Sequence, residues 1–181
     1  RDIFWYLKIC DDSQRAYYHP WLVMLNEQRR MHPSIAAFSS EAFYGGMLMN
    51  HPSTEHARDE IVDSVPYPGE PMLLVDLSGT FCAAGKNSDN SRFNVLSAVV
   101  SLAMALDAED DSGCGVAVIA PYAAQVRLIR AMLQDFRARK LQTDVSCATV
   151  HQFQGSERDV VIIDAVESFP AKSLGILTSN N

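Results

Sequence analysis

The sequence lacks the features of membrane, secreted and zinc-binding proteins. No run in its 181 residues approaches the roughly 18 consecutive apolar residues of a membrane-spanning helix, and no signal-peptide pattern stands at its start. The four cysteines are scattered and form no CxxC pair: Cys10, Cys82, Cys114 and Cys147. Such spacing is typical of reduced thiols, so we expect no metal site, no membrane partner and a location in the cytoplasm or the nucleus.

Positive charge is also scarce. The chain has 15 Lys and Arg against 22 Asp and Glu, a net charge of −7, which argues against an extended nucleic-acid surface. One stretch that is predicted to be helical is an exception. It contains one acidic residue, Asp135, and five basic residues: Arg127, Arg130, Arg137, Arg139 and Lys140. A basic helix is usually a solvated face, and the alternative here is modest long-range attraction for a nucleic-acid strand.

Apolar residues, in contrast, are plentiful at 48%, enough for a buried core in one domain of this length. The apolar pattern predicts strands near residues 22–25, 72–77, 116–120, 145–150 and 160–164, and helices near 34–44, 91–106 and 123–140. Residues 49–71 and 78–90 show no periodicity and are expected to be long connections. This alternation predicts an α/β fold, with a mainly parallel sheet and helices on both faces.

One polar segment stands out between two predicted strands, residues 149–157. Gln154 offers a forked amide, Gly155 allows backbone N–H groups to approach a ligand, and Glu157 can accept hydrogen bonds from hydroxyls. Such a set suits the phosphates and ribose of a nucleotide. The alternative is an ordinary connecting loop with solvated side chains. We expect its ligand-binding groups at the carboxyl ends of the strands, as in other open α/β sheets.

A second polar segment follows the first predicted strand. Arg29 and Arg30 are adjacent there, and guanidinium groups bind phosphate oxygens bidentately. Pro33 is a good first residue for the helix that comes next. The alternative is that both arginines are surface charges.

Together these segments resemble the second RecA-like domain of superfamily 1 helicases, in the branch of the nonsense-mediated-decay helicase and senataxin. Residues 28–33 read QRRMHP where the family has QYRMHP, and residues 43–48 read FYGGML for its FYxGxL element. Residues 120–125 read APYAAQ for TPYxxQ, and residues 149–157 read TVHQFQGSE for TVDxFQGxE. A weaker match is Ser91-x-x-Asn94. The blocks are collinear and cover roughly residues 20–165.

The resemblance implies an RecA-like, P-loop-NTPase-type domain over residues 20–181, after a linker or the tail of a preceding domain at 1–19. It further implies that Arg30 is the catalytic arginine that reaches the γ-phosphate. Gln28, Gln154, Gly155 and Glu157 are implied to border the nucleotide. Arg29 stands where the family usually has Tyr, which puts the packing around Arg30 in question.

The resemblance also implies a path for single-stranded DNA or RNA, with contacts from Pro121, Tyr122, Thr149 and His151. Such contacts hold the backbone of the strand and carry little sequence information. The alternative for Tyr122 is a core aromatic, because aromatic side chains are often simply packed.

The sequence does not contain every part that ATP hydrolysis requires. Residues 79–86 imitate a P-loop, but five residues separate the glycines where four are needed, and Asn87 follows Lys86 where Ser or Thr would hold magnesium. We interpret Asp164, at the end of an apolar run, as the end of a core strand. ATP and the ligands of Mg²⁺ are therefore expected to involve the first RecA-like domain.

The family has one further block, NVAxTRA, which should follow Leu177 but is not present in the 181 residues. The domain is therefore expected to be truncated at its C-terminus. Two functions remain open. One is the C-terminal motor domain of an ATP-dependent helicase or translocase, inactive alone, with the first RecA-like domain of the same polypeptide as partner. The other is a non-catalytic helicase-like scaffold.

Overall fold

The structure is a computed structural model that describes residues 3–7, 23–56, 58–64, 66–139 and 142–168. The predicted linker at 1–19 and the segment after residue 168 lie largely outside the described residues. The chain forms two compact units, residues 1–57 and 58–181, and each is described by itself. The prediction of one domain over residues 20–181 stays a prediction.

The first unit contains a pair of short parallel strands, β1 (Glu27–Gln28) and β2 (Met49–Asn50), with Gln28 opposite Asn50. It also contains α1 (Ile3–Tyr6), α2 (Pro33–Tyr44) and the 3₁₀ turn η1 (Pro52–Thr54). The strand predicted near 22–25 was wrong in its bounds, since residues 23–25 are not in a strand and Leu25 is 87% exposed. Backbone pairing with β2 is available only from Asn26 onwards.

Helix α2 confirms the helix predicted at 34–44, and both of its ends are encoded locally. The His32 side chain accepts a hydrogen bond from the Ser34 N–H at 3.2 Å, and Pro33 occupies the first turn. Gly45 then adopts φ 60°, the left-handed conformation that ends a helix at least cost in glycine.

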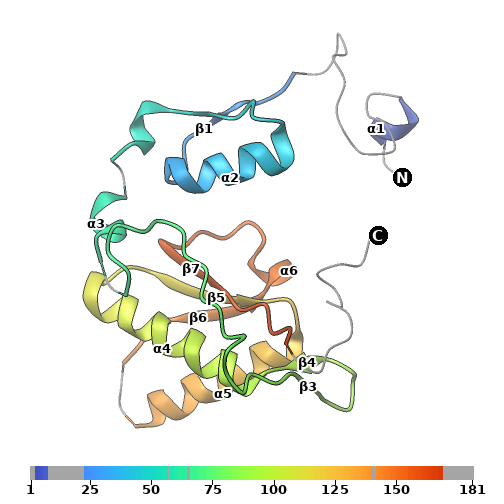
Figure 1. The fold of residues 1–181 in the computed structure, drawn as a ribbon, viewed down its shortest axis with the longest axis vertical. Coiled ribbons are helices and arrows are strands. Elements are labelled where there is room, and N and C mark those ends of the chain that lie inside the picture. Colours follow the sequence, from blue (N-terminus) through green and yellow to red (C-terminus); the bar gives the residue numbers. More distant parts are fainter. Residues whose placement is uncertain (1–2, 8–22, 57, 65, 140–141, 169–181) are drawn as a thin grey trace. The chain divides into compact units, whose positions relative to one another are not determined.

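The second unit is built on a parallel sheet with the strand order β6–β5–β7 (Figure 1). Strand β5 (Val116–Ala120) is central, and β6 (Ser146–Thr149) and β7 (Val160–Ile163) flank it. Helix α4 (Val95–Ser112) precedes β5, and α5 (Ala123–Ala138) connects β5 to β6. The short helices α3 (Asp59–Val62) and α6 (Val150–Phe153) complete the unit, together with a hairpin of β3 (Gly85–Lys86) and β4 (Arg92–Phe93).

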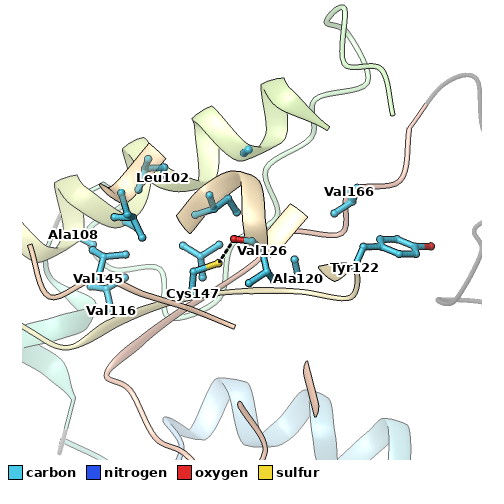
Figure 2. Packing of buried hydrophobic residues seen from close by; sticks show 14 residues of the cluster. Leu102, Ala108, Val116, Ala120, Tyr122, Val126, Val145, Cys147 and Val166 are labelled. Atoms are coloured by element: carbon cyan, nitrogen blue, oxygen red, sulfur yellow. Dashed lines mark hydrogen bonds between the residues drawn. The ribbon is translucent and has the colours of Figure 1, made fainter. Parts of the chain in front are cut away.

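The core lies between the sheet and the helices α4 and α5. Val116, Val118 and Ala120 point to this face of β5, where they join buried residues of both helices (Figure 2). Ala117 and Ile119, on the opposite face, are buried as well. The central strand is thus covered on both sides, as a parallel sheet requires. The predicted α/β class with a mainly parallel sheet is confirmed.

The structure departs from the prediction at three places between residues 72 and 95. The apolar residues 72–77 form no strand, because no described strand pairs with this segment. Leu74, within the segment, is 90% exposed. Residues 78–90, predicted as a plain connection, lead into the β3–β4 hairpin, which turns at Asn90 with φ 59°. Helix α4 begins at Val95, later than predicted, because the Asn94 side chain caps it by accepting a bond from the Ser97 N–H.

Candidate functional site

The side chain of Gln28 organises the turn that follows β1. It is buried, at 8% exposure. Its carbonyl oxygen accepts hydrogen bonds from the backbone N–H groups of Arg30 at 2.9 Å and Met31 at 2.8 Å. Its NH₂ group donates to the Met31 carbonyl at 3.0 Å and to Oδ1 of Asn50 at 2.7 Å. The turn that carries the two arginines is therefore built around one amide.

The two adjacent arginines are held differently. Arg29 forms an ion pair with Glu27 of β1, with Nη2 2.7 Å and Nε 2.9 Å from the same carboxylate oxygen. Arg30 is fixed through its backbone N–H by Gln28, and its residue is exposed. Both arginines follow directly after β1, which lies later in the chain than the strand predicted near residues 22–25. The assignment of Arg30, and not Arg29, as the residue that meets phosphate stays a prediction.

In the second unit, three of the predicted nucleic-acid residues come to one edge of the sheet. The parallel register sets Ala120 beside Thr149, so Pro121 and Thr149 lie at neighbouring strand ends. Thr149 also starts α6: its hydroxyl accepts the Gln152 N–H, and the Gln152 side chain accepts the Thr149 N–H, both at 3.4 Å. His151 lies in the first turn of α6 and is exposed.

The fourth predicted residue, Tyr122, is in a different position. It is only 6% exposed and belongs to the hydrophobic core, at the end of the cluster near Val166 (Figure 2). Its hydroxyl donates to the carboxylate of Glu167, which also pairs with Arg92. The Arg92 guanidinium lies 5.9 Å from the centroid of the Tyr122 ring. This burial favours the packed alternative, and contact with a nucleic-acid strand stays a prediction.

The residues of the predicted nucleotide loop are exposed but extend away from this edge. Gln154, Gly155 and Glu157 lie between α6 and β7, and Gly155 has φ 85°, which disfavours any other residue there. Two residues after Glu157, the N–H of Asp159 donates to the Gly115 carbonyl at 3.0 Å, just before β5 begins. The block thus begins at the carboxyl end of β6 and its second half leads to the amino end of β7, so the placement of its ligand-binding groups stays a prediction.

A buried polar network that the sequence did not single out lies beside the same sheet. Gln125 is 0% exposed, and its two N–H groups are shared among three acceptors: Oδ2 of Asp164 at 2.6 Å, the Asn94 carbonyl at 3.0 Å and the Ser97 hydroxyl at 3.1 Å. Its own carbonyl accepts the Asn94 N–H at 2.8 Å. Gln125 ends one matched block and Asn94 ends another. The membership of both residues in blocks of the family pattern was the indication of this network that the sequence offered.

Asp164 is confirmed as a core residue at the end of β7. Its second carboxylate oxygen accepts the N–H of Val166 at 3.0 Å, and the side chain is buried. The P-loop imitation is also excluded by its structure: Lys86 lies in the antiparallel strand β3, whereas a P-loop leads into a helix. Among the described residues, no group of three or more His, Cys, Asp or Glu side chains could hold a metal ion.

The basic residues of α5 take part in bonds within the chain. Arg130 donates from Nε and Nη2 to the Cys147 carbonyl of β6, at 3.0 and 2.8 Å. Arg127 pairs with Asp89 at 3.6 Å, Arg139 pairs with Asp135 at 3.4 Å, and Arg137 donates to the Thr143 carbonyl. These bonds favour a structural and solvated role for the described part of this helix.

Comparison with known proteins identifies the family. Residues 11–181 match the family model described as the AAA domain. DNA-binding protein SMUBP-2 of Rattus norvegicus is 31% identical over 163 residues, which cover 87% of this chain and 16% of that protein. The chain is a superfamily 1 helicase domain of the AAA domain family. It lies in the branch of the nonsense-mediated-decay helicase and senataxin, so the predicted resemblance and the RecA-like fold class are confirmed.

Other helicase relatives agree with this assignment. The Regulator of nonsense transcripts 1 homolog of Drosophila melanogaster is 28% identical over 155 residues, covering 84% of this chain and 13% of that protein. The DNA polymerase alpha-associated DNA helicase A of Schizosaccharomyces pombe is 28% identical over 171 residues, covering 84% of this chain and 24% of that protein. This helicase domain thus spans between 13% and 24% of the length of these three relatives. Among its described helices, none is long and apolar enough to cross a membrane.

Proposed function

We propose that this helicase domain is the C-terminal motor domain of an ATP-dependent helicase or translocase. In this role it contributes half of the ATP cleft and part of a single-strand path, and it is inactive alone. The observation that carries the proposal is the turn built by Gln28, which fixes the backbone of Arg30 directly after β1. A guanidinium on such a fixed turn is suited to neutralise charge on a γ-phosphoryl group.

The polar groups of the predicted nucleotide residues suit the phosphates and the ribose of ATP. Arg30 is exposed and always charged, Glu157 presents an exposed carboxylate suited to ribose hydroxyls, and Gly155 leaves the backbone beside Gln154 open to a ligand. ATP, bound together with Mg²⁺, would supply the phosphoanhydride bond whose hydrolysis would drive the movement of the two motor domains. We place the ligands of Mg²⁺ in the first RecA-like domain of the same polypeptide, because residues 79–86 depart from the P-loop pattern and Asn87 stands where Ser or Thr would hold magnesium.

On the nucleic-acid side, Pro121, Thr149 and His151 are the proposed contacts with single-stranded DNA or RNA. They share the edge formed by the ends of β5 and β6. The Thr149 hydroxyl acts as an acceptor in the α6 cap, so its own proton can be donated to a phosphate oxygen. Tyr122 supports this edge from the core in the present structure.

The second candidate is a non-catalytic helicase-like scaffold. Two observations favour it: the net charge of −7, and the ion pair of Glu27 with Arg29, which stands where the family usually has Tyr. An upstream P-loop and magnesium-binding carboxylate in the complete protein would support the motor, and their loss would support the scaffold.

The decisive experiment compares the two arginines in the complete protein. Arg30→Ala should lower the ATPase rate by roughly 10³-fold or more, with the fold and single-strand binding retained. Arg29→Ala should be far milder, because it removes only an exposed ion pair with Glu27. Full ATPase activity in Arg30→Ala would refute the proposed motor role of this turn. Equal losses in both variants would show that both arginines serve the phosphate.

A further inference from the structure

The amide of Gln28 has no hydrogen-bonding capacity left for a ligand. A primary amide has two N–H donors and two acceptor lone pairs. In Gln28 the donors bond to Met31 O and Asn50 Oδ1, and the acceptor takes the N–H groups of Arg30 and Met31. The orientation of the amide is fixed by its backbone partners, because an N–H can only donate and a carbonyl can only accept.

The four bonds connect three parts of the first unit. Asn50 lies opposite Gln28 in the register of β1 and β2, so the bond between their side chains ties the turn to the neighbouring strand. The bonds to Arg30 and Met31 close the turn itself. Since Gln28 is buried, replacing these bonds with water requires the turn to open. The conformation of the Arg30 backbone therefore depends on the Gln28 amide.

We propose that Gln28 is a positioning residue for Arg30 and not a nucleotide ligand. This inference rests on the proposed function of Arg30, and it revises the expectation that Gln28 binds the nucleotide. A ligand residue and a positioning residue differ in their kinetic effects. Loss of a nucleotide contact made equally in the ground state raises the KM for ATP, whereas misplacement of a group that acts on the transition state lowers kcat.

The test measures ATPase kinetics of the complete protein with single-stranded nucleic acid at saturation. Gln28→Ala should lower kcat by up to about 10²-fold, the size expected for a catalytic group displaced by about 1 Å. The KM for ATP and the preference for ATP over GTP should not change. Asn50→Ala removes one of the four bonds without touching the Arg30 N–H, so it should lower kcat in the same direction but less.

A double-mutant cycle makes the test specific. If Gln28 acts only through Arg30, then Gln28→Ala combined with Arg30→Ala should be no slower than Arg30→Ala alone. Gln28→Glu keeps the acceptor for the N–H groups of Arg30 and Met31 and loses both donors, to the Met31 carbonyl and to Asn50 Oδ1, so it should recover only part of the lost kcat. Gln134→Ala, on an exposed position of α5, is the matched control for loss of a glutamine and should match the unmodified protein.

The outcomes separate the inference from the proposed function. A raised KM for ATP, a changed base preference or additive losses in the double variant would overturn the positioning role while leaving Arg30 catalytic. Full activity of Arg30→Ala would overturn the proposed function instead. If thermal unfolding shows that Gln28→Ala does not fold, Asn50→Ala decides: a lower kcat at constant KM supports the inference, and a raised KM or unchanged kinetics overturns it.

Discussion

Substitution of Gln125 is the most direct way to test the energetics of the second unit. The Gln125 amide, fully buried, joins the start of α4 to the end of β7 through Asn94, Ser97 and Asp164. Gln125→Ala removes all four hydrogen bonds at once and leaves a space behind. The substitution does not alter the backbone of α5, because alanine is a good helix former.

The expected cost follows from the partners that remain. The N–H of Asn94 loses its bond to Oε1 of Gln125, and the Asp164 carboxylate keeps the N–H of Val166 but loses Nε2 of Gln125 at 2.6 Å. An unsatisfied buried polar group costs about 1–3 kcal/mol, and more when it is charged. We therefore expect Gln125→Ala to lower the free energy of unfolding by about 3–5 kcal/mol, a large part of the roughly 5–15 kcal/mol of a typical domain.

The assay is guanidinium-induced unfolding of the 181-residue chain at pH 7. Gln134→Ala is the control, because it removes an exposed glutamine from the same helix and should change the free energy of unfolding by no more than about 0.5 kcal/mol. Gln125→Glu adds a test of the charge: it removes the Nε2 donor and sets a second carboxylate against Asp164, so it should lower the free energy of unfolding more than Gln125→Ala does.

One result would refute this reasoning. If Gln125→Ala costs less than about 1 kcal/mol, or no more than Gln134→Ala, the unpaired groups of Asn94 and Asp164 must be satisfied in another way. The buried network would then contribute little to stability. A destabilisation by Gln125→Glu smaller than that by Gln125→Ala would likewise contradict the close approach of the Gln125 side chain to Asp164.

Three further predictions concern activity, reactivity and the nucleic-acid edge. The isolated chain should show no ATPase activity above buffer, with or without nucleic acid; turnover that Lys86→Ala abolishes would contradict this and restore the P-loop interpretation of residues 79–86. Burial raises the pKa of the Cys147 thiol from 9.0 to about 11, with Arg130 opposing and Asp164 reinforcing the shift. At pH 8 Cys147 should therefore be alkylated after Cys82 and Cys114, as followed by mass spectrometry. The contribution of the Cys147 thiol to stability should be intact below about pH 9 and be lost as the pH rises towards 11. Alkylation of Cys147 first would show that its pKa is not raised. Tyr122→Phe removes the hydrogen bond to Glu167 but keeps the aromatic ring. It should lower the free energy of unfolding by about 1–3 kcal/mol and leave the affinity for a single strand unchanged at matched salt. Weaker binding of the strand without a loss of stability would instead make Tyr122 a nucleic-acid contact.

The sequence by itself determined the features that depend on residues close together in the chain. Apolar periodicity located α2, α5, β5 and β7 to within a few residues, because the helical and strand repeats are complete within one segment. Pro33 marked the start of α2 through its own backbone preference. The family, too, was readable from short collinear blocks, since each keeps its residue types in a fixed local order.

Only the tertiary structure decided the features that require a distant partner. An apolar run becomes a strand only where a neighbouring strand pairs with its backbone. No described strand pairs with residues 72–77, and the first strand begins at Glu27 instead of near residue 22. Similarly, the aromatic ring of Tyr122 suits a core or a nucleic acid equally well by composition. Its burial beside Arg92 and Glu167 was decided by residues 30 and 45 positions away in the chain.

The polar residues show the same division most clearly. The types and order of Gln28, Arg30, Gln125 and Glu157 were visible in the sequence, and their roles were not. Gln28 and Gln125 proved to be buried and satisfied by Asn50, Asn94 and Asp164, while Glu157 lies on the exposed run towards the amino end of β7. A hydrogen-bonding side chain can serve a ligand or the fold, and burial together with a full set of partners decides between them.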